Sequence, residues 1–441
     1  MKNVHWIAEK MMRAALQAVD PYRLISDQTQ IQGTLLTVQN KQFDLNDFEH
    51  IYVVGAGKAC APMAQALEAL LGDRITAGTV VVKYNHSKPT RIIRILEAGH
   101  PIPDENTIQG TRQIAELAVR AGANDLVIVL LSGGGSALME WLPEEISLND
   151  LQKTNQSLLA CGADIEEINT IRKHLSLIKG GQLAKQIYPA TGLTLILSDV
   201  IGDPLPIIAS GPTVADDSTF SEAIDILNRY DLSNRIPESV QKYLQAGAKG
   251  LRPETPKAGD PLFRKMNNLI LGNNLLALQK AAEVARTDGL QTLIVTDRVQ
   301  GEVREIAKLL AGIFSAALNH GNPVAAPGCL IFGGEPTVTL KGNGKGGRNQ
   351  EMALAMLRAM QKETNRSFYF CSLGTDGTDG PTEAAGAWID HTTVQKARAR
   401  HLSIDAYLNN NDSYRFFRQI DQLIITGPTG TNVMDLLIFL F

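Results

Sequence analysis

The chain has 441 residues, with 42 basic and 46 acidic side chains and a formal net charge of −4. Because so small an imbalance creates no global field that would attract a polyanion, we expect no nucleic-acid partner, and any anion site must be local. The length exceeds what one ordinary hydrophobic core supports, so it excludes a small single-core protein and predicts two domains.

The start of the chain is typical of an amphipathic helix, since Ile7, Met11, Ala14 and Ala18 recur on one helical face. The segment lacks the apolar block and the small-residue cleavage site of a signal peptide. No apolar run reaches the roughly 18 residues of a membrane span, so no membrane partner is expected. The apolar end of the chain, LLIFLF, is predicted to form a buried strand.

The cysteines give no sign of a covalent or metal framework. Cys60, Cys161, Cys329 and Cys371 lie far apart with no CxxC pair, and the histidines include no HExxH sequence. Neither a disulfide framework nor a thiolate zinc site is therefore indicated. A reducing compartment fits this usage, so we expect a cytoplasmic protein.

From residue 51, short β-branched runs alternate with helical segments. The predicted strands are IYVVGAG, TVVVKYN, RILEAG, DLVIVLLSGGG and TLILSDV. Continuous apolar runs separated by helices indicate parallel strands covered on both faces, which predicts a Rossmann-like, doubly wound α/β domain over residues 1–245. Its ligands should bind at the carboxyl ends of the strands.

A segment rich in proline, glycine and lysine between Pro237 and Pro261 predicts the crossing into a second domain, residues 246–441. Strands are expected there at NLILG, TLIVTD, CLIFGG, TVTLK, SFYFCSLG and LIITG, with helices near 274–286, 302–318, 349–362 and 392–401. The neighbouring CLIFGG and TVTLK runs suggest an antiparallel pair, so this smaller α/β domain is predicted to contain a mixed sheet.

The run IYVVGAGKACA resembles a dinucleotide fingerprint, with Gly55 and Gly57 in place but Cys60 at the third glycine position. A NAD site also needs an acid at the end of the second strand, where this chain has Lys83. The strand, turn and helix can still bind a phosphate, with Lys58 adding a positive charge. The alternative is a surface lysine with a structural role.

A second glycine-rich turn, LLSGGGSAL, ends an apolar strand at the edge where ligands collect. Its small backbone units predict a nest of N–H groups for an anion, formed by Ser132, Gly133, Gly134, Gly135 and Ser136. It is not a nucleophile elbow, because GxSxG fails around both serines. The alternative is a tight loop without a ligand.

The run DIEEINTIRKHLSLIK predicts a helix with an apolar stripe for the core and a polar stripe of Asn169, Arg172, Ser176 and Lys179. Such a polar stripe is usually solvated. The alternative is that its cationic members, Arg172 among them, face an anionic ligand.

The stretch GGEPTVTLKGNGKGGRN, residues 333–349, contains six glycines with Lys341, Lys345 and Arg348 before a helical pattern. Glycines can turn successive N–H groups toward one point, and the helix start adds its positive dipole end. An anion site follows, in which Lys345 and Arg348 would bind phosphate or carboxylate. The alternative is a hairpin turn before a surface helix.

Carboxylates follow several predicted strands. Asp199 and Asp203 lie in LILSDVIGDP, Asp376 and Asp379 lie in SLGTDGTDGP, and Glu335 follows LIFGG. Carboxylate oxygens at a strand end suit Mg²⁺, for which Asp376 and Asp379 are the candidates, or a base that receives a hydroxyl proton. Asp–Gly is also common turn chemistry, which is the alternative for Asp376 and Asp379.

The chain resembles the glycerate kinases that end in a MOFRL domain. The resemblance rests on AGHPIPDE, LLSGGGSAL, IRKHLSLIKGGQLA, LSDVIGDPLPIIASGPT, GNGKGGRNQE, GTDGTDGPT, NDSYRFF and GPTGTNVMDL, which follow one another from about residue 51 to 437. It implies ATP-dependent phosphorylation of D-glycerate at its 2-hydroxyl, a Rossmann-like N-terminal domain, a MOFRL region at about 325–437, and an active site between the domains. It also implies that Lys58, Asp199 and Arg348 lie at the active centre.

The residues agree with that chemistry, because phosphoryl transfer needs positioning, charge stabilisation and a metal. The expected ligands are ATP, Mg²⁺ and D-glycerate, and the sequence leaves open which glycine-rich cradle binds which substrate. The alternative activity is an NAD(P)-dependent hydroxypyruvate reductase, against which Lys83 and Cys60 argue. A third possibility is a nucleotide-binding regulator without catalysis, which would lack the charged active-site residues that this chain has. The oligomeric state, with a homodimer as one option, stays open.

Overall fold

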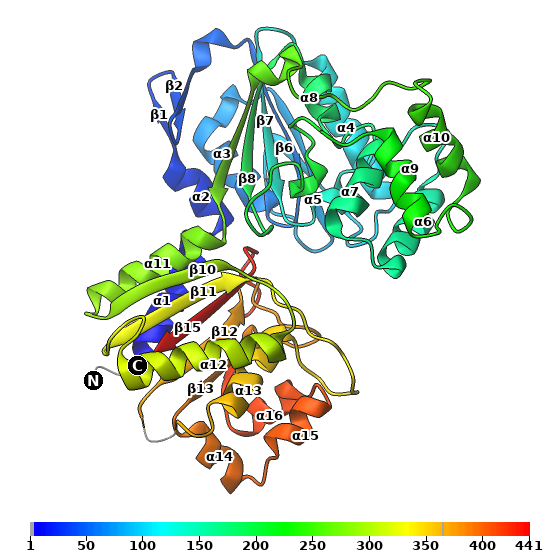
Figure 1. The fold of residues 1–441 in the computed structure, drawn as a ribbon. Coiled ribbons are helices and arrows are strands. Elements are labelled where there is room, and N and C mark those ends of the chain that lie inside the picture. Colours follow the sequence, from blue (N-terminus) through cyan, green and yellow to red (C-terminus); the bar gives the residue numbers. More distant parts are fainter. Residues whose placement is uncertain (1–3, 364–365) are drawn as a thin grey trace. The chain divides into compact units, whose positions relative to one another are not determined.

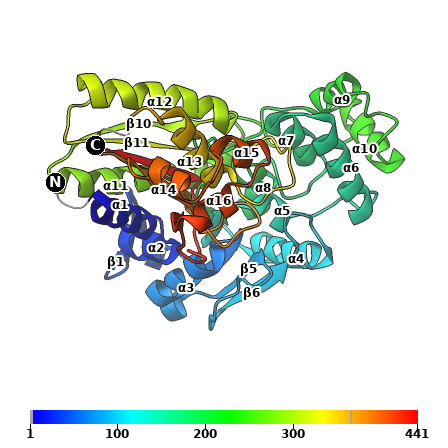
Figure 2. The same ribbon diagram turned by 90° about the horizontal axis from the view of Figure 1, so that it is seen from below.

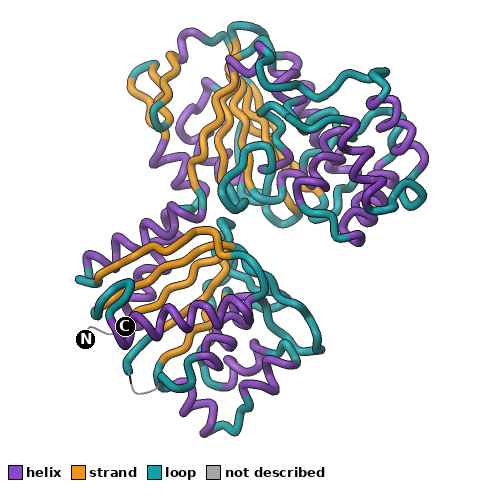
Figure 3. Tube along the Cα trace, in the orientation of Figure 1, coloured by secondary structure: helices purple, strands orange, loops and turns teal. Residues whose placement is uncertain are grey.

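The computed structural model describes residues 4–363 and 366–441. Its contacts divide the chain into two compact units. The N-terminal unit comprises Pro21–Leu271, and the C-terminal unit joins the chain up to Asp20 with Gly272–Phe441. Each unit is built around one six-stranded sheet, drawn in orange in Figure 3.

The sheet of the N-terminal unit has the order β6-β5-β4-β7-β8-β9. Its strands are β4 (His50–Ala56), β5 (Ala77–Lys83), β6 (Ile93–Ala98), β7 (Asp125–Ser132), β8 (Thr191–Leu197) and β9 (Met266–Gly272). The neighbouring strands β6 and β5, β5 and β4, β4 and β7, and β7 and β8 all pair in parallel. The chain moves outward from β4 to β6 and then returns to place β7 on the other side of β4, which confirms the predicted doubly wound architecture.

Helices and one small sheet complete the N-terminal unit. The helices are α2 (Pro21–Gln28), α3 (Cys60–Leu71), α4 (Glu105–Arg120), α5 (Gly135–Leu138), α6 (Leu148–Cys161), α7 (Ile165–His174), α8 (Gln182–Ile187), α9 (Phe220–Arg229) and α10 (Glu238–Ala248). The small sheet contains β1 (Thr29–Gln32), β2 (Leu35–Val38) and β3 (Lys41–Asp44). Helices α6, α7, α9 and α10 form a cluster with its own apolar core to one side of the large sheet (Figures 1 and 2).

The sheet of the C-terminal unit is mixed, as predicted, and has the order β10-β11-β15-β12-β13-β14. Its strands are β10 (Gln291–Val299), β11 (Gly328–Gly334), β12 (Tyr369–Gly374), β13 (Gly386–Asp390), β14 (Leu423–Ile424) and β15 (Asp435–Leu440). The prediction that LLIFLF forms a buried strand is confirmed, since β15 lies between β11 and β12 and runs antiparallel to both.

The predicted antiparallel pair of CLIFGG and TVTLK is wrong. TVTLK forms no strand, and Thr337 makes one isolated parallel bridge to Glu302. The central position beside β11 is taken by β15, from the end of the chain. The apolar strand β15 buries its side chains and pairs its backbone there, whereas most of TVTLK is exposed.

The helices of the C-terminal unit come from both ends of the sequence. They are α1 (Val4–Ala18), α11 (Asn274–Thr287), α12 (Val303–His320), α13 (Arg348–Ala359), α14 (Thr393–Ala399), α15 (Ile404–Asn409) and α16 (Ser413–Gln419). The predicted first helix is confirmed as α1, with Ile7 and Met11 buried, and it packs against α11. None of the helices in the part of the chain that the structure describes is long and apolar enough to cross a membrane.

The spatial boundary differs from the predicted one. The N-terminal unit continues to Leu271, whereas the sequence suggested an end at residue 245. The reason is that NLILG, expected in the second domain, forms β9 at the edge of the first sheet. The first helix belongs to the other unit for a similar reason, because its apolar face is buried by α11.

Aromatic rings fill the core of the C-terminal unit. Phe314 of α12 is fully buried and stacks on Phe439 of β15 with ring centroids 3.8 Å apart. The ring centroids of Phe332 and Phe370 also lie within 5.8 Å of the Phe314 centroid. One side chain therefore joins the helix to strands β11, β12 and β15.

Replacing this ring tests how much the unit depends on it. We expect Phe314→Ala to lower the free energy of unfolding by about 3–5 kcal/mol, because it leaves a cavity among buried rings. Urea denaturation followed by circular dichroism measures the change. Leu309→Ala is the matched control, since Leu309 lies on the same helix and is 67% exposed. A loss of under about 1 kcal/mol in Phe314→Ala would contradict this account of the core.

Candidate active site

The candidate site of the N-terminal unit lies at the carboxyl ends of β4, β7 and β8. Lys58 follows β4, the turn Ser132–Ser136 follows β7, and Asp199 follows β8. Strand order reverses between β4 and β7, and open α/β sheets bind ligands at such a switch point. The fold thus brings together three predicted features that are far apart in the sequence.

The turn after β7 is in close contact with charged side chains. A Cβ atom at Gly133 would lie 2.0 Å from Oδ2 of Asp199. A Cβ atom at Gly134 would lie 2.9 Å from Nε2 of His100 and 3.2 Å from Cε of Lys58. Only glycine leaves room for these groups, so Lys58, Asp199 and His100 all border one glycine turn.

Hydrogen bonds fix the β4 turn to the β7 turn. The Lys58 N–H donates to the Gly133 carbonyl at 2.9 Å, and the Ala59 N–H donates to Ser132 Oγ at 3.0 Å. Ser132 is 1% exposed, so its hydroxyl orients the neighbouring turn. The direct ligand contact predicted for Ser132 is not supported by these contacts.

Gly55 and Gly57 serve the packing of β4 beside β7. Gly55 lies inside β4, where an added Cβ would approach the Leu130 carbonyl oxygen to 2.2 Å. At Gly57 the same atom would lie 2.2 Å from Ser132 Oγ. Gly55, which was predicted to bind phosphate, is therefore needed because a side chain would clash with β7. Gly57, predicted for the same role, shapes the turn.

His100 was not among the predicted site residues, although it lies in the quoted AGHPIPDE sequence. Its pKa is lowered to about 4, mainly by burial and also by the nearby positive charge of Lys58. The imidazole is thus neutral at physiological pH. Its position after β6, at the same carboxyl edge of the sheet, was the signal that could have identified it.

A chain of polar side chains extends from the glycine turn. Ser136 Oγ lies 2.7 Å from Ser210 Oγ, and Ser210 donates to Asn169 Oδ1 at 2.8 Å. The backbone at Ala209 and Ser210 is left-handed, with φ of 49° and 60°. Such strain costs about 1–3 kcal/mol per residue and is typical of functional sites.

Helix α7 ends at His174, so the predicted long helix is shorter than expected. Its polar stripe is also not solvated. Asn169 and Ser176 are buried, and Lys179 is fully buried in an ion pair with Glu140 at 2.6 Å. Arg172 is half-buried and donates from Nε to Asn155 Oδ1 at 2.8 Å.

Arg348 of the C-terminal unit is held by carboxylates. It forms a bidentate pair with the fully buried Asp435, at 2.6 Å from Nε and 2.9 Å from Nη2. Its Nη1 donates to Glu335 at 2.9 Å. These carboxylates raise the pKa of Arg348 against the opposing effect of burial. The guanidinium is therefore charged and fixed, and Glu335 contacts it directly.

Within the anion site predicted over residues 333–349, three backbone N–H groups already have acceptors inside the protein. The N–H groups of Lys341 and Gly342 donate to Asn411 Oδ1, and the Lys345 N–H donates to Asp412 Oδ1 at 2.8 Å. The Lys345 ammonium lies 4.7 Å from the Tyr414 ring centroid. The quoted NDSYRFF sequence thus supplies intramolecular acceptors where an external anion was expected.

The start of α13 is capped from within the unit as well. Asp379 is 3% exposed and accepts the N–H groups of Asn349 and Gln350 at 3.1 and 2.8 Å. Burial raises its pKa to about 6. A carboxylate with both oxygens on backbone N–H groups fits a helix cap and does not fit the predicted metal site. Asp376 accepts the Thr378 N–H at 3.0 Å.

Within residues 4–363 and 366–441, no three His, Cys, Asp or Glu side chains are arranged to hold a metal ion.

Comparison with known proteins agrees with this architecture. Residues 7–245 match a domain of unknown function, DUF4147, and residues 328–435 match the MOFRL family. A glycerate 2-kinase of Pyrococcus horikoshii is 41% identical over 99% of this chain and 97% of its own. The chain belongs to the MOFRL-domain glycerate kinase family.

A solved family structure has the same fold. The glycerate kinase of Thermotoga maritima superposes with a TM-score of 0.88 at 40% identity, covering 99% of each chain. Another relative, from Agrobacterium vitis, is named a putative hydroxypyruvate reductase and is 43% identical over 87% of this chain and 85% of its own. Both predicted activities thus occur among the names of this glycerate kinase family's members.

The packing of Lys58 against His100 can be tested by titration. Because burial is the main cause of the low pKa, we expect Lys58→Met to raise the His100 pKa from about 4 while leaving it below 6.5. NMR titration of the histidine ring protons measures it, with His100→Gln to assign the signal. Since the unfolded chain binds this proton more readily, His100 favours unfolding as the pH falls from 6.5 toward 4.

Lys41→Met, at an exposed lysine of β3, is the matched control and should leave the titration unchanged. An ordinary His100 pKa in the wild type, or no response to Lys58→Met, would contradict the arrangement around Gly134.

Proposed function

We propose that this member of the family transfers the γ-phosphoryl group of ATP to the 2-hydroxyl of D-glycerate, giving ADP and 2-phosphoglycerate. The observation that supports it most is the convergence of Lys58, the Ser132–Ser136 turn and Asp199 at the switch point of a parallel sheet. The relatives named glycerate 2-kinase and glycerate kinase are similar over nearly the whole chain.

Phosphoryl transfer requires positioning and charge stabilisation more than covalent chemistry. Lys58 supplies a positive charge beside the glycine turn, which suits a phosphoryl group. Asp199, which borders the same turn at Gly133, is assigned to orient the 2-hydroxyl and receive its proton. Three of the five guanidinium N–H groups of Arg348 are used by carboxylates, so two can still stabilise phosphoryl charge.

Mg²⁺ is part of this proposal in a limited form. Mg²⁺ usually keeps several waters and binds one or two carboxylates together with substrate phosphates. Asp379 does not fit because its oxygens cap α13, which leaves Asp376 as the candidate from the predicted pair. We assign to Mg²⁺ the neutralisation of phosphate charge.

The cellular setting is proposed on separate grounds. The four cysteines are all free thiols, which fits a reducing cytoplasm; they are Cys60, Cys161, Cys329 and Cys371.

A homodimer is the assembly proposed for this protein, and analytical ultracentrifugation tests it.

The competing activity is an NAD(P)-dependent hydroxypyruvate reductase, since two relatives from Agrobacterium vitis are named putative hydroxypyruvate reductases. In a NAD-binding sheet the second strand ends in an acid that binds the ribose. Here β5 ends in Lys83, and Cys60 occupies the third glycine position at the start of α3. These two residues favour the kinase.

The proposal is tested by incubating the purified chain with ATP, Mg²⁺ and D-glycerate and identifying the product by phosphorus NMR. We expect ADP and 2-phosphoglycerate in equal amounts. Oxidation of NAD(P)H with hydroxypyruvate, without ADP formation, would reject the kinase in favour of the reductase.

Asp199 gives a sharper test within the same assay. Asp199→Asn preserves size and removes the charge, so we expect turnover to fall by about 10²–10⁴-fold if this carboxylate receives the proton. Asp217→Asn, at an exposed aspartate of the same unit, is the matched control and should behave as wild type. A folded Asp199→Asn enzyme with near-normal turnover would show that Asp199 only shapes its turn.

A further inference from the structure

Arg172 differs from Arg348 in how its hydrogen-bonding capacity is used. One of its five N–H groups, at Nε, donates to Asn155. The four N–H groups at its Nη atoms have no hydrogen-bond partner among the residues that the structure describes. Burial lowers the pKa of this arginine, while Glu140 acts in the opposite direction. A half-buried guanidinium with its fork unused is poised to bind an anion.

The charge next to Arg172 suits a small anion. Lys179 and Glu140 form a buried ion pair at 2.6 Å, and Lys179 also donates to the Met139 carbonyl at 2.7 Å. That pair is neutral as a unit, so Arg172 adds a single positive charge. A single carboxylate matches this charge, whereas a triphosphate carries several negative charges.

The hydrogen-bond chain beside Arg172 has a direction. Ser210 donates its only hydroxyl proton to Asn169, so Ser136 must donate its own to Ser210. Ser136 Oγ is left as an acceptor. It can accept a hydrogen bond from a hydroxyl group, but an ionised phosphate has no proton to donate.

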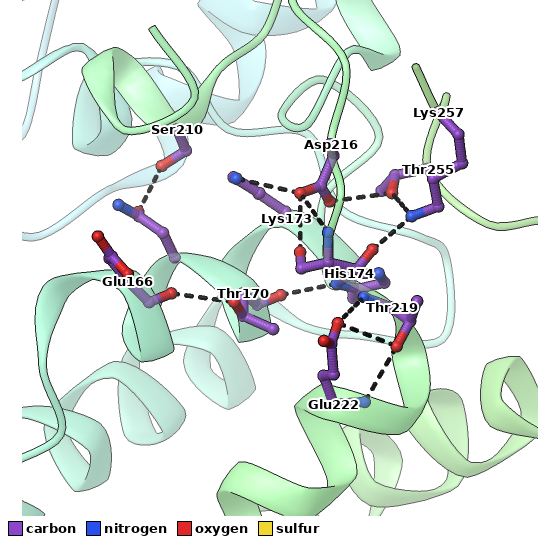
Figure 4. A network of polar contacts seen from close by, with 12 residues as sticks. Glu166, Thr170, Lys173, His174, Ser210, Asp216, Thr219, Glu222, Thr255 and Lys257 are labelled. Atoms are coloured by element: carbon purple, nitrogen blue, oxygen red, sulfur yellow. Dashed lines mark hydrogen bonds and ion pairs between the residues drawn. The ribbon is translucent and has the colours of Figure 1, made fainter. Parts of the chain in front are cut away.

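Helix α7 is held in place by a buried polar network (Figure 4). Lys173 pairs with Asp216 at 3.1 Å, and Thr255 donates to the same carboxylate at 2.9 Å. His174 contacts Glu254 through Nε2 at 3.1 Å. Asn169 and Arg172, one helical turn apart on α7, are therefore presented on an anchored helix, which favours binding because little order is lost.

We infer that Arg172 binds the carboxylate of the hydroxy-acid substrate through its free guanidinium fork, while Ser136, oriented through Ser210 and Asn169, accepts a hydrogen bond from a substrate hydroxyl. This assignment rests on the proposed function and deepens it. It places the substrate hydroxyl beside Ser136 of the glycine turn and leaves Lys58, which lies next to Gly134 of that turn, for the transferred phosphoryl group.

The test compares D-glycerate with D-glyceramide, in which a neutral amide replaces the carboxylate. We expect Arg172→Gln to raise the KM for D-glycerate by about 10- to 150-fold, as for loss of charge-assisted hydrogen bonds, with the KM for ATP unchanged. D-glyceramide should be used poorly by the wild type and no worse by the variant. Arg172→Lys keeps the charge but loses the fork, so its KM for D-glycerate should lie between those of the wild type and Arg172→Gln.

Arg94→Gln is the matched control, because Arg94 is exposed on β6 and should leave both KM values unchanged. Thermal unfolding checks that each variant is folded. A rise in the KM for ATP instead of D-glycerate would overturn the inference in favour of a phosphate site. The inference would also be overturned if Arg172→Gln left both KM values unchanged. It would be overturned as well if the variant lost as much activity with D-glyceramide as with D-glycerate.

Calorimetric binding of D-glycerate without ATP separates this inference from the proposed function. If the wild type forms no ADP but binds D-glycerate, and Arg172→Gln abolishes that binding, the kinase assignment fails and the subsite stands. If the wild type does not bind D-glycerate, the subsite is rejected.

Discussion

The candidate site depends on the parallel pairing of β4 with β7. That pairing brings the turns after both strands to one edge of the sheet, and it requires glycine at Gly55 because the Leu130 carbonyl lies so close. Lys58, the glycine turn and Asp199 then meet although about 140 residues separate the first from the last. The strained backbone at Ser210 adds a hydroxyl chain to the same edge.

The two units satisfy their charged groups differently. In the C-terminal unit, the buried carboxylate of Asp435 is bound by the Arg348 guanidinium, and that of Asp379 is bound by two backbone N–H groups of α13. In the N-terminal unit, Lys179 pairs with Glu140 Oε2, Glu140 Oε1 has no hydrogen-bond partner among the described residues, and Arg172 keeps an unused fork. Since unpaired buried charge is costly, groups that are satisfied internally mainly provide rigidity, and those that are not are the better candidates for ligand binding.

Much of the fold follows from local pattern. Apolar runs alternating with helical segments predicted the doubly wound sheet, and LLIFLF predicted a buried strand, because both signals depend on neighbouring residues. The errors have one cause. NLILG forms an edge strand of the first sheet, and TVTLK forms no strand. Which segments pair in a sheet depends on residues far apart in the sequence, and the local periodicity of a segment carries no information about them.

The sequence by itself determined the parallel architecture, the family resemblance and the residue types of a phosphoryl-transfer site, because strand periodicity, turn chemistry and motif order are local properties. Only the tertiary structure decided which of those residues have unused hydrogen-bonding capacity. Asn411 and Asp412 occupy the N–H groups of the 341–345 loop, and Asp379 caps α13. The sequence cannot show this, because whether a donor is free depends on which distant acceptor folding brings to it.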